Sequence, residues 1–126
     1  MKGHMMKRLF ALLLLCAPLQ ASAEVMHYSK CTLEAGKTIA NVQAWVDAWR
    51  PLAKKHGVEY SVRLMLPHAD SQLAANQFYI EGGSPTLQSY AAAWQWWYTH
   101  ADALASNAQL TAAASCDSGA VYRSTD

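Results

Sequence analysis

The sequence predicts an α+β domain of ferredoxin-like type, in which two helices cover one face of a four-stranded antiparallel sheet. The first observation is an amphipathic helix over residues 84–104, which carries three of the five tryptophans. The second is the order strand, helix, strand, strand, helix, strand, which is the split βαβ pattern. The third is a cysteine pair, Cys31 and Cys116, that this topology brings together because its first and last strands are neighbours.

The helix over residues 84–104 is predicted from its start and its periodicity. Ser84 suits an N-cap, because its hydroxyl can accept a hydrogen bond from a free backbone N–H, and Pro85 suits the first helical position. Spacings of three and four residues place one apolar stripe on a single helix face. The stripe consists of Leu87, Tyr90, Trp94, Trp97, Ala101 and Leu104. Core packing is the common use of such a stripe, and a ligand-binding box is the alternative.

The other elements follow from alternating apolar and polar residues and from breakers. Strands are expected over residues 25–33, 59–66, 76–81 and 114–123. Gly82-Gly83 is expected to end the third strand, and Gly119 to mark a bulge in the last. A helix begins after Thr38 and stops at Gly57, with a kink or a restart at Pro51. An alanine-rich run after residue 104 allows a further short helix.

The chain begins with the pattern of a removable secretion signal. A basic start precedes an apolar run over residues 9–16, and small residues at 21–23 fit a cleavage site. The run is shorter than the about 20 residues that a membrane span needs. We therefore expect residues 1–23 to be removed and residues 24–126 to form one domain in the periplasm or in the medium, with no transmembrane segment in the mature chain.

Charge and cysteines narrow the classes of partner. Removal of residues 1–23 takes three of the ten basic residues and none of the nine acidic ones, which leaves a net charge near −2. No basic patch is present to neutralise phosphates, so nucleic acid is not an expected partner. Cys31 and Cys116 remain, and an even pair in an oxidising compartment indicates a disulfide. In the chain-entropy model such a long loop contributes about 4–5 kcal/mol.

The expected topology leaves one sheet face without helices. On the covered face, Trp45 or Trp49 should meet Trp94 or Trp97. The uncovered face mixes polar and apolar side chains, namely Arg63, Met65, Gln77, Tyr79 and Glu81, with Tyr28 as a further member. Three uses of this face stay open: an ordinary exposed sheet, the interface of a homodimer with two sheets face to face, and a ligand cleft.

The sequence contains no catalytic or metal-binding motif. Its histidines lack metal-ligand spacing, and neither a nucleophile elbow nor a glycine-rich phosphate loop is present, so no metal and no cofactor are expected. His68 follows Pro67 at a strand end, where sites are often built. His100 lies one turn from Trp96, off the apolar stripe. The candidate pocket or interface residues are Arg63, Met65, His68, Tyr79, Trp96 and His100.

The element order, the size and the mixed open face resemble the dimeric α+β barrel group, which includes the antibiotic-biosynthesis-monooxygenase-like domains. Residues 31–38, Leu66-Pro67 and Ser115-Cys116 are also similar to small secreted bacterial proteins of unassigned function. We expect a binding or interaction domain whose partner is a second copy or a small apolar ligand. The alternative that the resemblance implies is a monooxygenase-like enzyme with a pocket between sheet and helices.

A simple observation separates these two functions. An enzyme should show a closed pocket with His68, Arg63 or Tyr79 converging on it. A binding module should show a flat or grooved apolar face without such a polar cluster.

Overall fold

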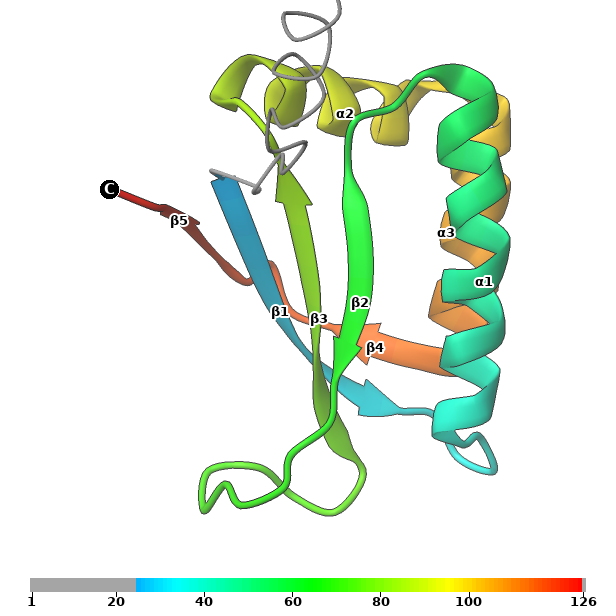
Figure 1. Cartoon of the computed structure of the whole chain (residues 1–126). Coiled ribbons are helices and arrows are strands. Elements are labelled where there is room, and N and C mark those ends of the chain that lie inside the picture. The colour runs from blue at the N-terminus through cyan, green and yellow to red at the C-terminus, as the bar shows by residue number, and fades with distance from the viewer. Residues whose placement is uncertain (1–24, 126) are drawn as a thin grey trace, which may run out of the picture.

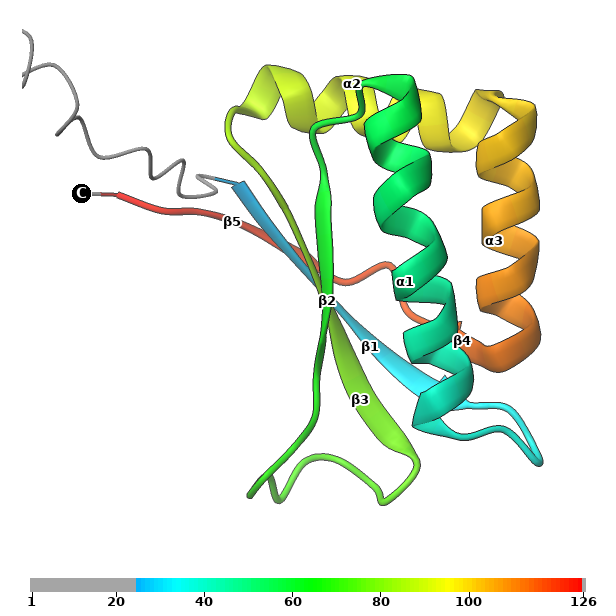
Figure 2. The same cartoon turned by 45° about the vertical axis from the view of Figure 1, so that its right-hand side comes forward.

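Residues 25–125 of the computed structural model form one antiparallel sheet and three helices; the expected signal lies outside these described residues. The strand order is β2-β3-β1-β4, and β5 pairs with a second part of β1. Figures 1 and 2 show α1 and α3 side by side on one face of the sheet, with α2 across one end. The elements are β1 (Val25–Leu33), α1 (Ile39–His56), β2 (Ser61–Met65), β3 (Gln77–Ser84), α2 (Leu87–Thr99), α3 (Ala101–Ala113), β4 (Ala114–Cys116) and β5 (Ala120–Arg123).

The α+β, ferredoxin-like fold class is confirmed, but the helix expected over residues 84–104 is two helices. The backbone is extended at His100 (φ −85°, ψ 138°), and the His100 side chain caps the start of α3. The N-cap of α2 is Thr86, whose hydroxyl accepts the N–H of Ser89 at 3.0 Å, and not Ser84. Ser84 instead ends β3, fully buried, and donates its hydroxyl to the carbonyl of Glu59 at 2.7 Å.

The break at His100 changes the expected apolar stripe. Leu104 lies on α3 and is 52% exposed, and Leu87 at the start of α2 is 61% exposed. The middle of the stripe keeps its expected role, because the indole of Trp97 contacts Trp49 (ring centroids 5.5 Å apart) and Trp45 (6.4 Å) of α1. The meeting of tryptophans over the sheet is therefore confirmed through Trp97.

Two glycine predictions have different outcomes. Gly82-Gly83 does not end β3, which continues to Ser84 while pairing with both β1 and β2. At the other position, Cys31 pairs with Cys116 and Tyr28 with Ala120, so three residues of the last strand oppose two of β1. This extra residue is the bulge expected at Gly119, whose φ is +74°. It divides the expected last strand into β4 and β5.

The first helix agrees with its predicted limits. Thr38 is the N-cap of α1, and Gly57 adopts the left-handed conformation (φ 64°) that ends it. The helix is continuous through Pro51, which lies at an exposed position. Its apolar face packs on the sheet with Val42 and Val46 fully buried. No helix within residues 25–125 is long and apolar enough to cross a membrane.

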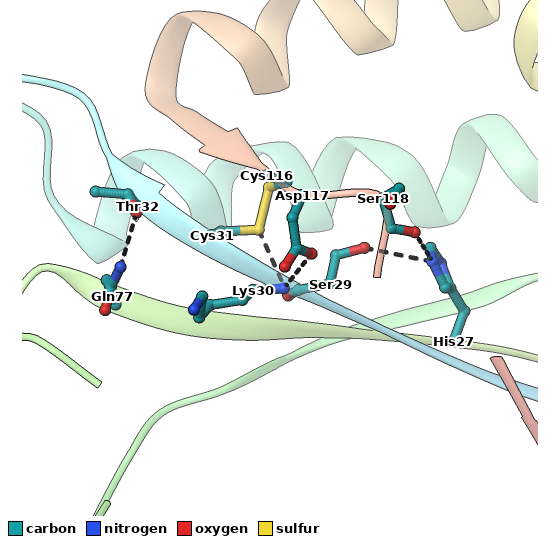
Figure 3. The surroundings of a disulfide bond; sticks show 9 residues. All are labelled: His27, Ser29, Lys30, Cys31, Thr32, Gln77, Cys116, Asp117 and Ser118. Carbon is teal, nitrogen blue, oxygen red and sulfur yellow. Dashed lines mark hydrogen bonds between the residues drawn. A yellow bond between two sulfur atoms is a disulfide. The ribbon is translucent and has the colours of Figure 1, made fainter. Parts of the chain in front are cut away.

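The disulfide between Cys31 and Cys116 is present, with an S–S distance of 2.06 Å. It joins two directly opposed residues of β1 and β4, as the predicted neighbourhood of the first and last strands requires. Figure 3 shows that the bond lies beside the main-chain and side-chain hydrogen bonds that hold the segment after Cys116 on β1. The disulfide therefore anchors the C-terminal part of the chain to the centre of the sheet.

Candidate functional site

A cavity of about 330 Å³ lies between the covered face of the sheet and the helices. This volume falls in the range of small-molecule sites, about 300–1,000 Å³. Six aromatic rings line it, and they come from α1, from α2 and from the residue before β2. These rings belong to Trp45, Trp49, Tyr60, Trp94, Trp97 and Tyr98. Ala93 of α2 also lines the cavity, and its small side chain leaves space where a larger one would fill it.

The polar end of the cavity comes from alternation along β1. His27, Ser29 and Cys31 share the helix-facing side of the strand, and all three are buried. His27 is 6% exposed and Ser29 is 9% exposed. A buried polar group is costly unless it is hydrogen-bonded. Their presence at core positions therefore points to specific partners.

Each ring nitrogen of His27 has a hydrogen-bond partner. Its Nε2 lies 2.9 Å from the carbonyl oxygen of Ser118, and its Nδ1 lies 3.2 Å from the hydroxyl of Tyr60. A carbonyl oxygen can only accept, so Nε2 carries a hydrogen, and in the tautomer protonated at Nε2 alone Nδ1 accepts the hydroxyl proton of Tyr60. The hydroxyl of Ser29 lies 3.5 Å from Nε2. The contacts thus direct Nε2 at the Ser118 carbonyl and Nδ1 at the Tyr60 hydroxyl.

Tyr60 connects His27 to the aromatic wall. Burial raises the pKa of its hydroxyl, which therefore stays protonated and acts as a donor. Its ring lies at centroid distances of 6.0 Å from Trp94 and 6.1 Å from Tyr90. A Cβ atom on Gly82 would lie 1.9 Å from the Tyr60 oxygen, so only glycine allows the ring this position. Gly82 is thus needed for the site and not as a strand end.

The segment after the disulfide places the carbonyl that fixes His27. The main-chain N–H of Lys30 donates to the Asp117 carboxylate at 2.9 Å, and the N–H of Asp117 donates to the Lys30 carbonyl at 2.9 Å. Figure 3 shows Cys116, Asp117 and Ser118 following one another along β1 toward the His27 ring. A Cβ atom on Gly119 would lie 2.7 Å from His27 Nε2. The bulge and the disulfide thus hold the Ser118 carbonyl next to His27 at the polar end of the cavity.

The predicted candidates on the open sheet face form a separate group. Arg63 is ion-paired with Glu81 across β2 and β3. Tyr28 donates a hydrogen bond to Glu81, which raises the pKa of the Tyr28 hydroxyl. Met65 is 40% exposed, and Tyr79 lies opposite it on β3. This surface contains the expected members, but these residues point away from the cavity.

His68 is exposed in the loop between β2 and β3. The remaining predicted candidates, Trp96 and His100, lie beyond the aromatic wall of the cavity. Their rings stack on each other at 5.5 Å, and His56 lies 4.5 Å from His100 between ring centroids. The cavity wall, as formed by residues 25–125, includes none of the six candidates.

Sequence reasoning missed His27, Ser29, Tyr60 and Ser118. One signal could have found two of them. A disulfide to the last strand places Cys31 in the sheet interior, and residues two apart on a strand share a face. His27 and Ser29 lie four and two residues before Cys31, so all three side chains are expected on the same, inward face of the strand. The roles of Tyr60 and Ser118 depend on contacts across strands, which periodicity does not reveal.

Comparison with known proteins supports the fold assignment. No protein-family model matches the chain, and no curated protein is similar to it in sequence. Among solved structures, it is similar to SnoaB, a cofactor-independent oxygenase from Streptomyces nogalater, with a TM-score of 0.56 and 11% identity. The match covers 83% of this chain and 96% of that one. At this identity the likeness concerns the fold alone, and it agrees with the α+β architecture described above.

Proposed function

We propose that this protein binds one flat, mainly apolar small molecule in the cavity between sheet and helices. The observation that supports the proposal is a buried His27, held by Tyr60 and Ser118 at one end of a cavity of about 330 Å³ that six aromatic rings line. The cavity opens to solvent beside the exposed Tyr98, Asp117 and Ser118, so a small molecule can reach it. An open, mainly apolar hollow with a few polar groups at one end is the usual form of a small-molecule site.

The wall chemistry indicates what the ligand offers. Aromatic rings favour stacked or edge-on contact with another flat ring. Among residues 25–125, Asp117 is the one acidic side chain of the wall, and its carboxylate accepts a hydrogen bond from the main-chain N–H of Lys30. The polar end presents the hydroxyls of Ser29 and Tyr60. The ligand class that fits is an uncharged aromatic molecule with one hydroxyl or carbonyl group.

Titration with 2-naphthol and naphthalene, followed by tryptophan emission, tests this proposal. Both should bind saturably, and 2-naphthol should bind about 5–10-fold more tightly, because one extra hydrogen bond contributes about 1 kcal/mol. Ala93→Leu should fill the cavity and abolish binding, while Ala91→Leu, at an exposed position of the same helix, should not. Absence of saturation, or equal binding by the Ala93 and Ala91 variants, would reject the cavity as a ligand site.

We also propose that the protein acts outside the cytoplasm as residues 24–126. The signal pattern before residue 24 and the disulfide between Cys31 and Cys116 support this location. Mass spectrometry of the exported protein should give the mass of residues 24–126 less two hydrogens. Retention of residues 1–23, or two free thiols, would contradict it.

Dimerisation through the open sheet face is the proposed assembly. The face carries a half-buried Tyr28, whose ring lies 5.8 Å from that of an exposed Tyr122, together with the exposed Met65. Exposed apolar groups of this kind often mark interfaces. Light scattering should give twice the chain mass, and Met65→Glu should give the monomer mass. A monomer at high protein concentration in the unmodified chain would exclude this interface.

A second candidate is an oxygenase that needs no cofactor, which the fold likeness to SnoaB favours. The cavity would then supply a proton path in which a substrate hydroxyl donates to the Tyr60 oxygen, and Tyr60 donates to His27 Nδ1. Oxygen uptake with 1,4-dihydroxynaphthalene should exceed its autoxidation rate and fall to that rate in Tyr60→Phe. If oxygen uptake stays at the autoxidation rate while 2-naphthol still binds, the oxygenase proposal is rejected and the binding proposal stands.

A further inference from the structure

Three helix ends meet at a cluster that lies apart from the cavity. His56 is the last residue of α1, His100 joins α2 to α3, and Asp102 is in the first turn of α3. His56 Nε2 lies 2.8 Å from Asp102 Oδ2, and one ligand atom from each of the three side chains lies within 4.8 Å of the other two. We propose that His56, His100 and Asp102 bind one divalent transition-metal ion of the zinc class.

The donor set is chemically suited to such an ion. Two imidazole nitrogens and one carboxylate oxygen are common zinc ligands, and a water molecule completes the tetrahedron in open sites. Bonds of about 2.0–2.1 Å place tetrahedral ligand atoms about 3.3 Å apart. The His56–Asp102 pair, now at 2.8 Å, must therefore open by about 0.5 Å to admit the ion, and ligand atoms up to 4.8 Å apart must approach. The Asp102 side chain, 44% exposed, can move and leaves room for the water.

The helix ends supply a favourable field. The carbonyl ends of α1 and α2 carry partial negative charge and converge on His56 and His100, whereas only the N-terminus of α3 is positive. Asp102 adds a full negative charge, which Lys55 partly offsets because its charge acts on Asp102. A cation at this junction therefore meets two negative helix ends and one carboxylate, against one positive helix end at the start of α3.

His100 has a use that does not require a metal. Its Nδ1 accepts the main-chain N–H of Asp102 at 3.1 Å, which caps α3. An ion that takes the bare nitrogen of His100 replaces this cap. Asparagine is also a good N-cap but lacks the imidazole. His100→Asn therefore separates the two roles, since it keeps a cap and removes a metal ligand.

The site can be tested by calorimetric titration with Zn²⁺. The protein is prepared metal-free and without a histidine tag. One ion per chain should bind, and His100→Asn and Asp102→Asn should each weaken binding at least tenfold, with unchanged circular dichroism. His68→Gln, which removes an exposed histidine outside the cluster, should leave the affinity unchanged. Absence of saturable binding, or equal affinities of the His100 and His68 variants, would overturn the proposal.

An optical readout locates the ion. The Trp96 ring lies 5.2 Å from His56 and 5.5 Å from His100 between ring centroids, so bound Ni²⁺ should quench Trp96 emission. Trp96→Phe should lose most of this quenching while still binding the ion. Full quenching in Trp96→Phe would place the ion elsewhere. The cavity variant Ala93→Leu should keep Zn²⁺ binding, so this test is independent of the ligand proposal.

Discussion

Replacement of Gly82 by alanine should destabilise the protein through Tyr60, more than 20 residues earlier in the chain. The added Cβ would lie 1.9 Å from the Tyr60 oxygen and 2.2 Å from its Cζ, whereas ordinary contacts need well over 3 Å. The ring must therefore move by more than about 1 Å, which removes its hydrogen bond to His27 Nδ1. A lost hydrogen bond with a buried acceptor left unpaired costs about 1–3 kcal/mol, and overpacking costs about 1–3 kcal/mol more.

Urea denaturation followed by circular dichroism measures this cost. We expect the free energy of unfolding to fall by about 2–6 kcal/mol and the slope with urea to stay unchanged. The control is the same substitution in a Tyr60→Leu background, where no ring blocks the Cβ. There alanine should be neutral or stabilising by about 0.5–1 kcal/mol, because glycine weakens a strand interior. An equal loss in both backgrounds would refute the role assigned to the Gly82–Tyr60 contact.

Three further outcomes are expected. Cys31→Ala with Cys116→Ala should lower the free energy of unfolding in urea by about 3–5 kcal/mol, because the bond closes a loop across most of the domain; a loss below about 1 kcal/mol would contradict this. Above pH 10 the unfolded state loses the tyrosine proton that folded Tyr60 keeps, so stability should fall with pH, by up to about 1.4 kcal/mol per unit from this residue. In Tyr60→Phe the free energy of unfolding should fall less steeply with pH above 10. An unchanged pH dependence in this variant would contradict the role of Tyr60. Gly119→Ala, at φ +74°, should weaken 2-naphthol binding by displacing His27, and unchanged affinity would oppose that.

Several features were predictable because they depend on local periodicity. Alternation and helical spacing predict the strands and helices, and their order leads to a sheet in which the first and last strands are neighbours. The Cys31–Cys116 bond follows from that order without any side-chain geometry. The Trp97 contacts with α1 follow from the position of the aromatic stripe on one helix face.

Other features were decided by competition between local interactions. Residues 84–104 have helical periodicity throughout, yet His100 interrupts it because its imidazole caps Asp102 in an extended conformation. Gly82 looks like a strand end in the sequence, yet it is paired on both sides within β3. Its real function, space for Tyr60, concerns a neighbouring strand that single-residue propensity does not describe.

The candidate sites themselves depend on the tertiary structure. His27 meets Tyr60 and Ser118 across separations of 33 and 91 residues, and His56 meets Asp102 across 46. Periodicity assigns a side chain to a face of its own element, which places His27 inward once Cys31 is known to be buried. Which side chains then meet is set by strand register, by the bulge before β5 and by the directions of the three helices. The sequence alone therefore determined the architecture and its covalent bond, and tertiary packing decided where chemistry can occur.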